Sequence, residues 1–206
     1  KYKYSKYLKI SCLSVHIGSQ ITSHKPFEKM LNVVKKTIFK SKHVFEFVDL
    51  GGGMGIQYGP KDKKLSYKVY QKLIKKFLTT IKSKIIFEPG RAIIGNAGLI
   101  ISKIIYIKHT PRTDFIIIDA AMNDLIRPAL YGASHRILAS RKNNFKNYRR
   151  HEFVGPICET SDKFMSTKYY QRLNQNDYLV ICDVGAYGMV LSSNYNLRPK
   201  PVEILV

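Results

Sequence analysis

The chain has 206 residues, of which 45% are hydrophobic and 24% are charged, so it can bury a sizeable core and is too apolar to be disordered. The apolar stretch at 92–102 is too short to cross a bilayer, and no signal-peptide pattern opens the sequence. These features exclude a membrane-spanning protein. They predict one large globular domain or two small ones, with no membrane partner.

Lys and Arg number 35 against 14 Asp and Glu, which gives a formal net charge of +21. Such an excess invites a nucleic-acid-binding interpretation. The lysines, however, form short clusters interrupted by apolar residues, as at 61–64 and 75–76. We therefore favour a solvated, lysine-rich surface and predict no nucleic-acid partner. The three cysteines include no CxxC pair, which predicts a reduced, cytoplasmic location and no metal site.

The first half of the sequence alternates predicted strands and helices. Apolar and β-branched runs predict strands at 8–17, 44–50 and 85–87. A stripe of apolar side chains predicts a helix at 26–40, and Ser66 is placed to cap a second helix whose apolar face reaches Ile81. Because the strands are nearly continuous apolar runs, this order indicates a parallel sheet or barrel covered by helices.

The second half of the sequence has a different character. Three further strands are predicted, with little helix between them, at 99–107, 115–119 and 178–183. A charged, asparagine-rich stretch at 136–150 is predicted to be a loop or an edge strand. Together these segments predict a mostly antiparallel β domain that begins near 94–98.

A polar or glycine-rich motif follows each predicted strand of the first half, where ligands bind in parallel α/β folds. Gly51, Gly52 and Gly53 could bring backbone N–H groups onto a phosphate, or form a plain tight turn. His16 could stack on a flat ring or act as an acid or base, or be a satisfied core histidine. Glu88 could pair with a protonated ring nitrogen, or with the nearby arginine.

Candidate ligand residues also occur in the second half. Arg127 and Tyr131 are one helical turn apart and could together hold a carboxylate. Cys158 could be a small buried hydrophobe, although the adjacent Glu159 makes a site more plausible. Tyr187 lies between small residues and could reach a phosphate, or simply pack at a turn. The chemistry of the polar segment 192–199 is not evident from its residue types.

Taken together, these motifs resemble the diaminopimelate decarboxylase family of fold-type III pyridoxal-phosphate enzymes. The matching stretches keep their order across nearly the whole chain: HIGSQI at 16–21, DLGGGMGI at 49–56, EPGR at 88–91, DAAMNDLIRPALY at 119–131, GPICETSD at 155–162 and GAYGMVLSSNYNLRP at 185–199. DLIRPALY favours this family over the ornithine and arginine decarboxylases, which share the fold.

The resemblance implies a fold of class α/β plus β. Residues 1–95 would form the C-terminal part of a (β/α)8 alanine-racemase-like barrel that binds the cofactor. Residues 96–206 would form a mostly antiparallel β-sandwich or β-barrel domain, with a returning segment near 185–199.

The resemblance also implies pyridoxal 5'-phosphate as cofactor and meso-diaminopimelate as substrate, which the complete enzyme would convert to L-lysine and CO2. The cofactor-binding residues would be His16, Ser19, Gly51, Gly52, Gly53, Glu88, Gly90 and Tyr187. His16 would stack on the pyridine ring, and Glu88 would pair with its nitrogen. The substrate-binding residues would be Arg91, Arg127, Tyr131 and Glu159.

Two further implications concern catalysis and assembly. His16, Cys158 and Glu159 would be the catalytic residues. Cys158 and Glu159 would enter the active site of the neighbouring subunit, so that a homodimer builds two shared sites.

One departure from the family pattern limits the activity that we expect. The lysine that holds the cofactor covalently in this family precedes the HIGSQ motif, and nothing in this chain matches it. A smaller departure is Thr160-Ser161, where the family more often has Ser-Gly. The sequence lacks an initiator methionine and ends in the apolar run 201–206, so we expect both ends to be cuts through a longer protein.

We therefore predict that this chain is the C-terminal portion of such a decarboxylase and is inactive alone. The alternatives are a non-catalytic remnant that still binds a partner subunit and, less favoured, a basic nucleic-acid-binding domain.

Overall fold

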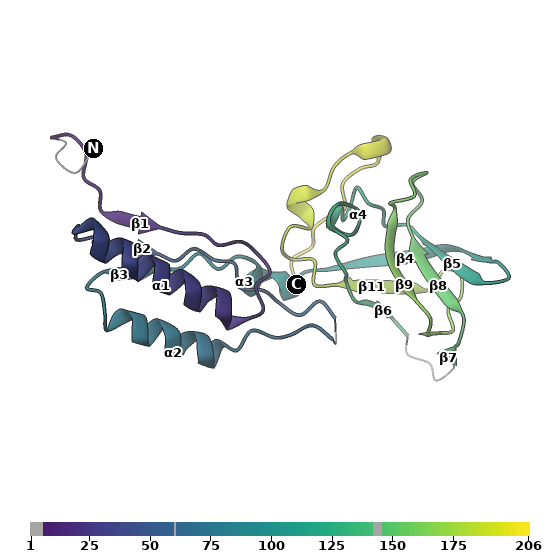
Figure 1. The fold of residues 1–206 in the computed structure, drawn as a ribbon. Helices are drawn as coiled ribbons and strands as arrows, with labels where there is room; N and C mark the ends of the chain where they lie inside the picture. Colours follow the sequence, from purple (N-terminus) through teal and green to yellow (C-terminus); the bar gives the residue numbers. More distant parts are fainter. Residues whose placement is uncertain (1–5, 60, 142–145) are drawn as a thin grey trace. The chain divides into compact units, whose positions relative to one another are not determined.

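The computed structural model describes residues 6–59, 61–141 and 146–206. The chain divides into two compact units (Figure 1). Unit 1 comprises Lys1–Gln57 and Lys61–Ile93, and unit 2 comprises Tyr58–Pro60 and Ile94–Val206. No helix in the described part of the chain is long and apolar enough to cross a membrane.

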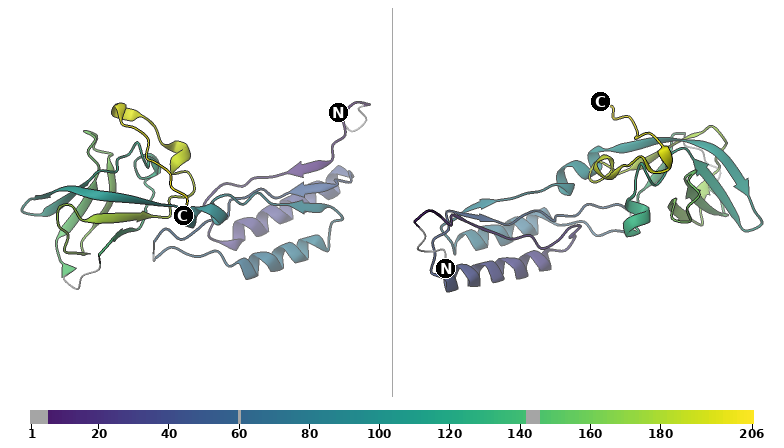
Figure 2. Two further views of the ribbon diagram at one scale, coloured as in Figure 1. Left: turned by 180° about the vertical axis from the view of Figure 1, so that it is seen from behind. Right: turned by 90° about the horizontal axis from the view of Figure 1, so that it is seen from above.

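Unit 1 is a parallel sheet of three short strands in the order β1 (Cys12–Ser14), β2 (Phe47–Asp49) and β3 (Lys84–Ile86). Helices α1 (His24–Ser41) and α2 (Tyr67–Leu78) both lie on one face of this sheet (Figures 1 and 2). The predicted alternation of strands and helices is therefore confirmed. Strands β1 and β2 are shorter than predicted, since only three residues of each run form a strand, whereas β3 has the predicted length and begins one residue earlier.

The two helices begin at serine N-caps. Ser23 Oγ accepts a hydrogen bond from the N–H of Lys25, and Ser66 Oγ accepts one from Val69, as predicted for Ser66. Helix α2 ends at Leu78, so the predicted extension to Ile81 is wrong. The hydroxyls of the two threonines that follow Leu78 donate to the carbonyls of Lys76 and Phe77, which satisfies acceptors that another helical turn would have used.

The apolar faces of α1 and α2 meet over the sheet and form the core of unit 1. Phe27 is fully buried, and its ring lies 4.8 Å from that of Tyr70 in an edge-on arrangement. Val48 and Leu50 supply the sheet side of this core. The predicted apolar stripes are thus the buried stripes, because helix residues three and four apart share a face.

Unit 2 contains a curved, six-stranded mixed sheet in the order β6-β11-β4-β5-β8-β9. Its strands are β4 (Leu99–His109), β5 (Thr113–Ile118), β6 (Ile137–Ala139), β8 (Arg150–Val154), β9 (Lys163–Thr167) and β11 (Tyr178–Cys182). All neighbours are antiparallel except β5 and β8, which are parallel. The predicted α/β plus mostly antiparallel β architecture is confirmed.

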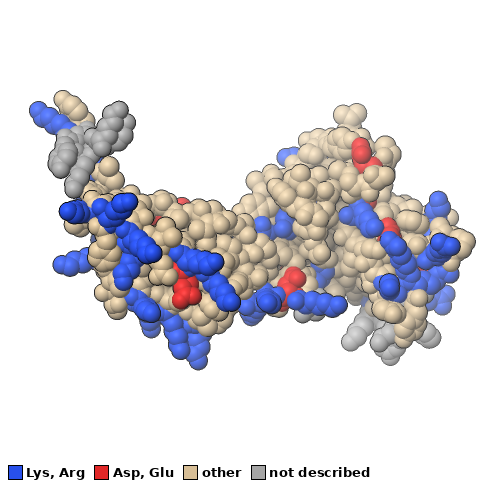
Figure 3. Space-filling view, viewed as in Figure 1, with Lys and Arg blue, Asp and Glu red and all other residues tan. Residues whose placement is uncertain are grey.

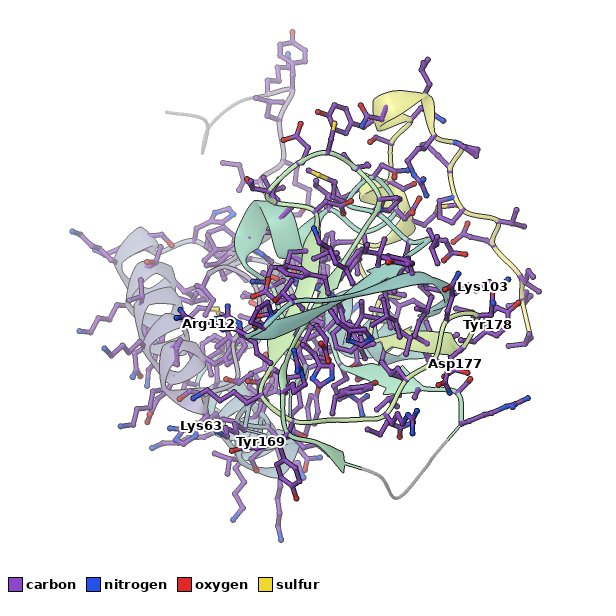
Figure 4. The ribbon with its side chains drawn as sticks, turned by 90° about the vertical axis from the view of Figure 1, so that its right-hand side faces the viewer. Lys63, Lys103, Arg112, Tyr169, Asp177 and Tyr178 are labelled. Atoms are coloured by element: carbon purple, nitrogen blue, oxygen red, sulfur yellow. The ribbon has the colours of Figure 1, made fainter. Side chains whose placement is uncertain are left out.

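Alternation along the strands places one side of this sheet in the core. Ile116 and Ile118 of β5 are buried together with Ile104 of β4 and with Leu179 and Ile181 of β11. Side chains of the other face form cross-strand pairs, such as Lys103 beside Tyr178 (Figure 4).

Strands β8 and β9 were not predicted, and the stretch 136–150 is more structured than expected. It contains the edge strand β6 and also β7 (Lys146–Asn147), which pairs with β10 (Tyr170–Gln171). Positions 142–145 of this stretch lie outside the described residues. The remaining elements are short: α3 (Arg91–Ile94), α4 (Arg127–Tyr131), η1 (Gly95–Ala97), η2 (Met189–Leu191) and η3 (Tyr195–Leu197).

A buried histidine on β8, His151, makes the stability of unit 2 depend on pH. Asp114 lies 2.8 Å from Nδ1 of His109, 3.2 Å from Nε of Arg149 and 3.8 Å from Nε2 of His151. His151 is almost fully buried, and this burial lowers its pKa from the ordinary 6.5 despite the nearby carboxylate. The folded protein therefore keeps His151 neutral at a pH where the unfolded chain would protonate it.

The sign follows from proton linkage: the contribution of His151 is fully present above pH 6.5 and is lost as the pH falls. We expect the free energy of unfolding in urea to fall between about pH 7 and pH 5, and to fall less in His151→Gln. The difference between the two proteins is at most about 1.4 kcal/mol for each unit by which the pKa of His151 is lowered. Burial raises the pKa of Asp124 and Asp162, so these two groups change the free energy of unfolding with pH in the opposite direction. Their contribution is the same in the unmodified protein and in His151→Gln. Equal slopes in the two proteins would contradict the prediction.

Candidate functional site

In unit 1, three loops meet beyond the carboxyl ends of the parallel strands. The N–H of Val15 donates to the carbonyl of Asp49 at 3.0 Å, and that of Leu50 donates to Ile86 at 3.0 Å. One step further, the N–H of Glu88 donates to the carbonyl of Gly51 at 2.8 Å. The parallel register therefore continues past the strands and brings the three predicted motifs of unit 1 together.

The glycine run after β2 is required by this close approach. A Cβ atom at Gly51 would lie 2.7 Å from the carbonyl oxygen of Val15, and one at Gly52 would lie 2.2 Å from that of Glu88. Gly53 has φ +87°, and a Cβ there would lie 2.5 Å from the carbonyl of Gly18. The three glycines thus let the backbones of the loops after β1, β2 and β3 approach one another closely. A plain tight turn after β2 would not require glycine at all three positions.

Two N–H groups of this run are already used within the protein. Gly51 donates to Oδ1 of Asp49 at 2.8 Å, and Gly52 donates to Nδ1 of His16 at 3.4 Å. Among the described residues, none accepts a hydrogen bond from the Gly53 amide. A phosphate bound by this loop would therefore meet Gly53 rather than the two preceding amides.

The Gly52 contact also defines the state of His16. Because Nδ1 accepts a hydrogen bond from an amide, the contact fits the neutral tautomer with the proton on Nε2. His16 is exposed, as are Ser19, Glu88 and Gly90, and a Cβ at Gly90 would meet no atom within 4 Å. Several polar groups are thus accessible beyond the strand ends.

Arg91 joins this group through a contact with Ser19. Its Nη2 donates to Oγ of Ser19 at 3.4 Å, so the arginine that follows β3 reaches the loop that follows β1. Ser14 supports the same region by donating to Oδ2 of Asp49 at 3.0 Å, which leaves Oδ1 for the glycine loop. Unit 1 therefore brings together every predicted site residue that it contains.

In unit 2, Arg127 is the first residue of helix α4, and its side chain is almost fully buried. Its guanidinium lies over the ring of Tyr58, with 4.7 Å from Cζ to the ring centroid. Its Nη1 lies 2.9 Å from Nε2 of His135. Tyr131, one turn further along α4, is 66% exposed, so only the tyrosine of the predicted pair lies at the surface.

Tyr187 adopts a backbone conformation that bulky residues rarely take, with φ +61°. Glycines on either side allow it. A Cβ at Gly185 would lie 2.0 Å from the carbonyl of Ile94, and one at Gly188 would lie 2.3 Å from that of Val184. The turn is therefore held by backbone packing, and Tyr187 is presented at the surface. Strained conformations of this kind concentrate at functional sites.

Cys158 and Glu159 are exposed on the loop between β8 and β9. The buried carboxylate of Asp162 holds this loop, since its Oδ2 accepts from the N–H of Ile157 and its Oδ1 accepts from Met122, both at 2.8 Å. Two exposed, potentially reactive side chains thus stand on a fixed backbone.

Sequence reasoning missed Tyr195, which contacts Glu159. Its hydroxyl donates to Oε1 of Glu159 at 2.6 Å. Tyr195 belongs to the segment 192–199, for which the signals in the sequence were its polar character and its place in the family-like stretch 185–199. Arg198 ties the same segment down by donating to Oδ1 of Asn123 and to the carbonyl of Asp119.

The Tyr195 contact predicts a coupled titration. The hydrogen bond to Glu159, followed by its negative charge, raises the pKa of Tyr195 above the ordinary 10.0. We expect Glu159→Gln to move this pKa back toward the ordinary value, measured from the ring-carbon NMR signal of Tyr195 in tyrosine-labelled protein. Glu152→Gln, a change of the same kind on β8, should leave the signal unaffected. A Tyr195 titration that is identical in all three proteins would contradict the prediction.

Comparison with known proteins decides the family. Residues 2–185 match the family described as pyridoxal-dependent decarboxylase, C-terminal sheet domain. The chain belongs to the pyridoxal-dependent decarboxylases.

Within the pyridoxal-dependent decarboxylases, the chain is homologous to diaminopimelate decarboxylases. It is 39% identical over 203 residues to that of Aquifex aeolicus and 41% identical over 204 residues to that of Pseudomonas aeruginosa. Each match covers 97% of this chain and 48% of the relative, so the chain spans about half the length of these relatives.

Solved structures of pyridoxal-dependent decarboxylases have the same fold. The diaminopimelate decarboxylase of Helicobacter pylori, solved in complex with L-lysine, matches with a TM-score of 0.87 at 34% identity, over 96% of this chain and 50% of that one. A lysine/ornithine decarboxylase from Vibrio vulnificus matches with a TM-score of 0.80 at 18% identity, which is a likeness of fold alone.

Proposed function

We propose that this chain is the C-terminal part of a pyridoxal-phosphate-dependent enzyme that converts meso-2,6-diaminopimelate to L-lysine and CO2. The observation that carries the proposal is the convergence of the three strand-end loops of unit 1. They bring His16, Ser19, Glu88 and Arg91 to the same end of the parallel sheet. The diaminopimelate decarboxylases among the relatives support the choice of reaction.

These residues suit pyridoxal phosphate. Ser19 and the Gly53 amide are hydrogen-bond donors of the kinds that bind phosphate. Arg91, which contacts Ser19, would help to hold the distal end of the substrate. His16 offers a flat, neutral ring for stacking, and Glu88 offers a carboxylate for the pyridine nitrogen. When bound, the cofactor would supply an electron-withdrawing ring for the electron pair left as CO2 departs. Glu88 would keep the ring nitrogen protonated and so preserve that property.

For the residues of unit 2 we propose roles in recognising the substrate and in catalysis. Arg127 would bind the distal carboxylate, and Tyr131 would close on the same group. Tyr187 would reach the cofactor phosphate with its hydroxyl. Cys158 and Glu159 would act in the site of a second subunit, and their exposed position on a fixed loop suits this role.

The chain alone should not turn over substrate, because nothing in it matches the lysine that holds the cofactor in this family. We expect no CO2 release when the purified chain is given pyridoxal phosphate and meso-diaminopimelate. We expect release when it is co-expressed with the portion of the Aquifex aeolicus relative that the match leaves uncovered. Release by the chain alone would overturn the requirement for a second portion.

A non-catalytic remnant that binds a partner subunit is the main alternative. It predicts that the two portions form a complex, seen by size-exclusion chromatography, that releases no CO2. A matched variant separates the two cases further. Glu88→Gln in the co-expressed complex should abolish release under the decarboxylase proposal, whereas a remnant has no release to lose.

Nucleic-acid binding is a less favoured alternative, suggested by the charge of +21. Lys and Arg side chains gather over the helices of unit 1, with few Asp and Glu among them (Figure 3). This alternative predicts binding to DNA or RNA that weakens steeply as salt is raised. Absence of binding at low salt would dismiss it.

A further inference from the structure

His135 holds Arg127 in a defined orientation. The imidazole is buried with 3% exposure and lies between two partners. Its Nδ1 is 3.0 Å from the carbonyl oxygen of Cys182 on β11, and its Nε2 is 2.9 Å from Nη1 of Arg127. Neither His135 nor its contacts were predicted from the sequence.

The two partners of His135 determine its tautomer. A guanidinium has only donors, so Nε2 must accept from Arg127. A carbonyl oxygen has only lone pairs, so Nδ1 must carry the proton and donate to Cys182. The geometry therefore requires a neutral imidazole with its proton on Nδ1, because a protonated ring would have no acceptor for Arg127.

A second aromatic ring restricts the same guanidinium. Tyr58 is 5% exposed and lies beneath the Arg127 guanidinium, and it also packs edge-on against the His135 ring, with 5.1 Å between the ring centroids. The ring of Tyr58 covers one side of the guanidinium, and Nε2 of His135 sets the direction of Nη1. A neutral imidazole restricts the guanidinium without cancelling its positive charge. A carboxylate in the same place would cancel that charge.

We propose that His135 is a positioning residue that orients the Arg127 guanidinium to receive the distal carboxylate of the substrate. This inference rests on the proposed function, in which Arg127 binds that carboxylate. Bidentate recognition of a carboxylate depends on the direction of the guanidinium fork, so losing the His135 contact should weaken substrate binding even though Arg127 itself is kept.

Two substitutions separate the roles of the two ring nitrogens. In His135→Gln, the side-chain oxygen can take the place of Nε2 and accept from Arg127, while the bond to Cys182 is lost. In His135→Asn, the side-chain NH2 can take the place of Nδ1 and keep the bond to Cys182, while the contact from position 135 to Arg127 is lost. The pair is matched, because each amide keeps one contact of the imidazole and removes the other.

The first readout needs neither a variant nor a ligand. In the histidine-labelled 206-residue chain at pH 7, we expect nitrogen NMR spectra of His135 to show a protonated Nδ1 and an unprotonated Nε2. A proton on Nε2, or on both nitrogens, would overturn the proposal. This measurement stands even if neither variant folds.

The second readout reports on Arg127 directly. With labelled arginine, we expect separate Nη signals for Arg127 in the unmodified protein and in His135→Gln, because rotation of the guanidinium is restricted. In His135→Asn we expect the two signals to average. Separate signals in both variants would show that His135 does not fix the guanidinium.

The third readout is the affinity for meso-diaminopimelate, titrated by NMR or calorimetry. We expect His135→Asn to weaken binding about tenfold and His135→Gln to retain it within about threefold. Equal affinity in all three proteins would overturn the positioning role. This titration uses the complex with the co-expressed portion; if that complex binds no meso-diaminopimelate, the result counts against the proposed function, and the two spectral readouts still decide the role of His135.

Discussion

Replacing Gly52 with alanine is expected to lower the free energy of unfolding by about 3 kcal/mol. The added Cβ would lie 2.2 Å from the carbonyl oxygen of Glu88 and 3.1 Å from its carbonyl carbon, both of which are backbone atoms. The clash cannot be relieved by rotating a side chain. Relief requires the loops after β2 and β3 to separate, which would also strain the hydrogen bond from the Glu88 N–H to the Gly51 carbonyl.

Gly90→Ala is the matched control in the same unit. A Cβ at Gly90 meets no atom within 4 Å, so we expect a change of less than about 0.5 kcal/mol in the free energy of unfolding. Urea unfolding followed by circular dichroism would measure both variants. Similar losses at Gly52 and Gly90 would mean that the loops are not packed as closely as the structure describes.

Replacing Asp183 with alanine should also be costly, by about 3 kcal/mol. The carboxylate is buried and accepts hydrogen bonds from Nε and Nη2 of Arg136, at 2.9 and 3.0 Å, and from Nδ2 of Asn96 at 2.5 Å. The bond to Asp183 raises the pKa of Arg136, which keeps the guanidinium charged. Alanine would leave these donors without their acceptor, and φ is +64° at this position, where alanine is strained.

Asp183→Asn separates these contributions. Asparagine tolerates the left-handed conformation and keeps one acceptor oxygen, so we expect roughly half the loss seen with alanine. The thermal or urea unfolding of the two variants would be compared with that of the unmodified protein. A loss below about 0.5 kcal/mol in Asp183→Ala would show that the cluster contributes little to stability.

The sequence was most informative where a local pattern determines local structure. The Ser66 cap and the apolar stripes of α1 and α2 were predicted, because helix formation depends on residues three and four apart. The three strand-end motifs were also predicted to lie together, since parallel strands end at the same edge of a sheet. The lengths of β1 and β2 were overestimated and that of β4 was underestimated, because an apolar run does not show where ladder pairing stops.

Features that depend on distant partners were not predictable in the same way. Strand β8 was missed because Arg150 and Glu152 interrupt its apolar residues, and its parallel pairing with β5 leaves no local signal. His135 depends on a backbone carbonyl 47 positions away, and Tyr195 on a carboxylate 36 positions away. Such contacts follow from the way the β unit folds, and residue types alone do not reveal them.

The assignment of Tyr58 and its two neighbours to unit 2 has a practical consequence for dividing the protein. A cut at the sequence boundary near Ile94 would give a piece starting there that contains Arg127 and His135 but lacks the ring beneath the guanidinium. A protein designed to start at this boundary would therefore lack part of the surroundings of the Arg127 side chain. Adding the 58–60 segment back as a separate peptide, or grafting it through a short linker, would be needed to restore those surroundings.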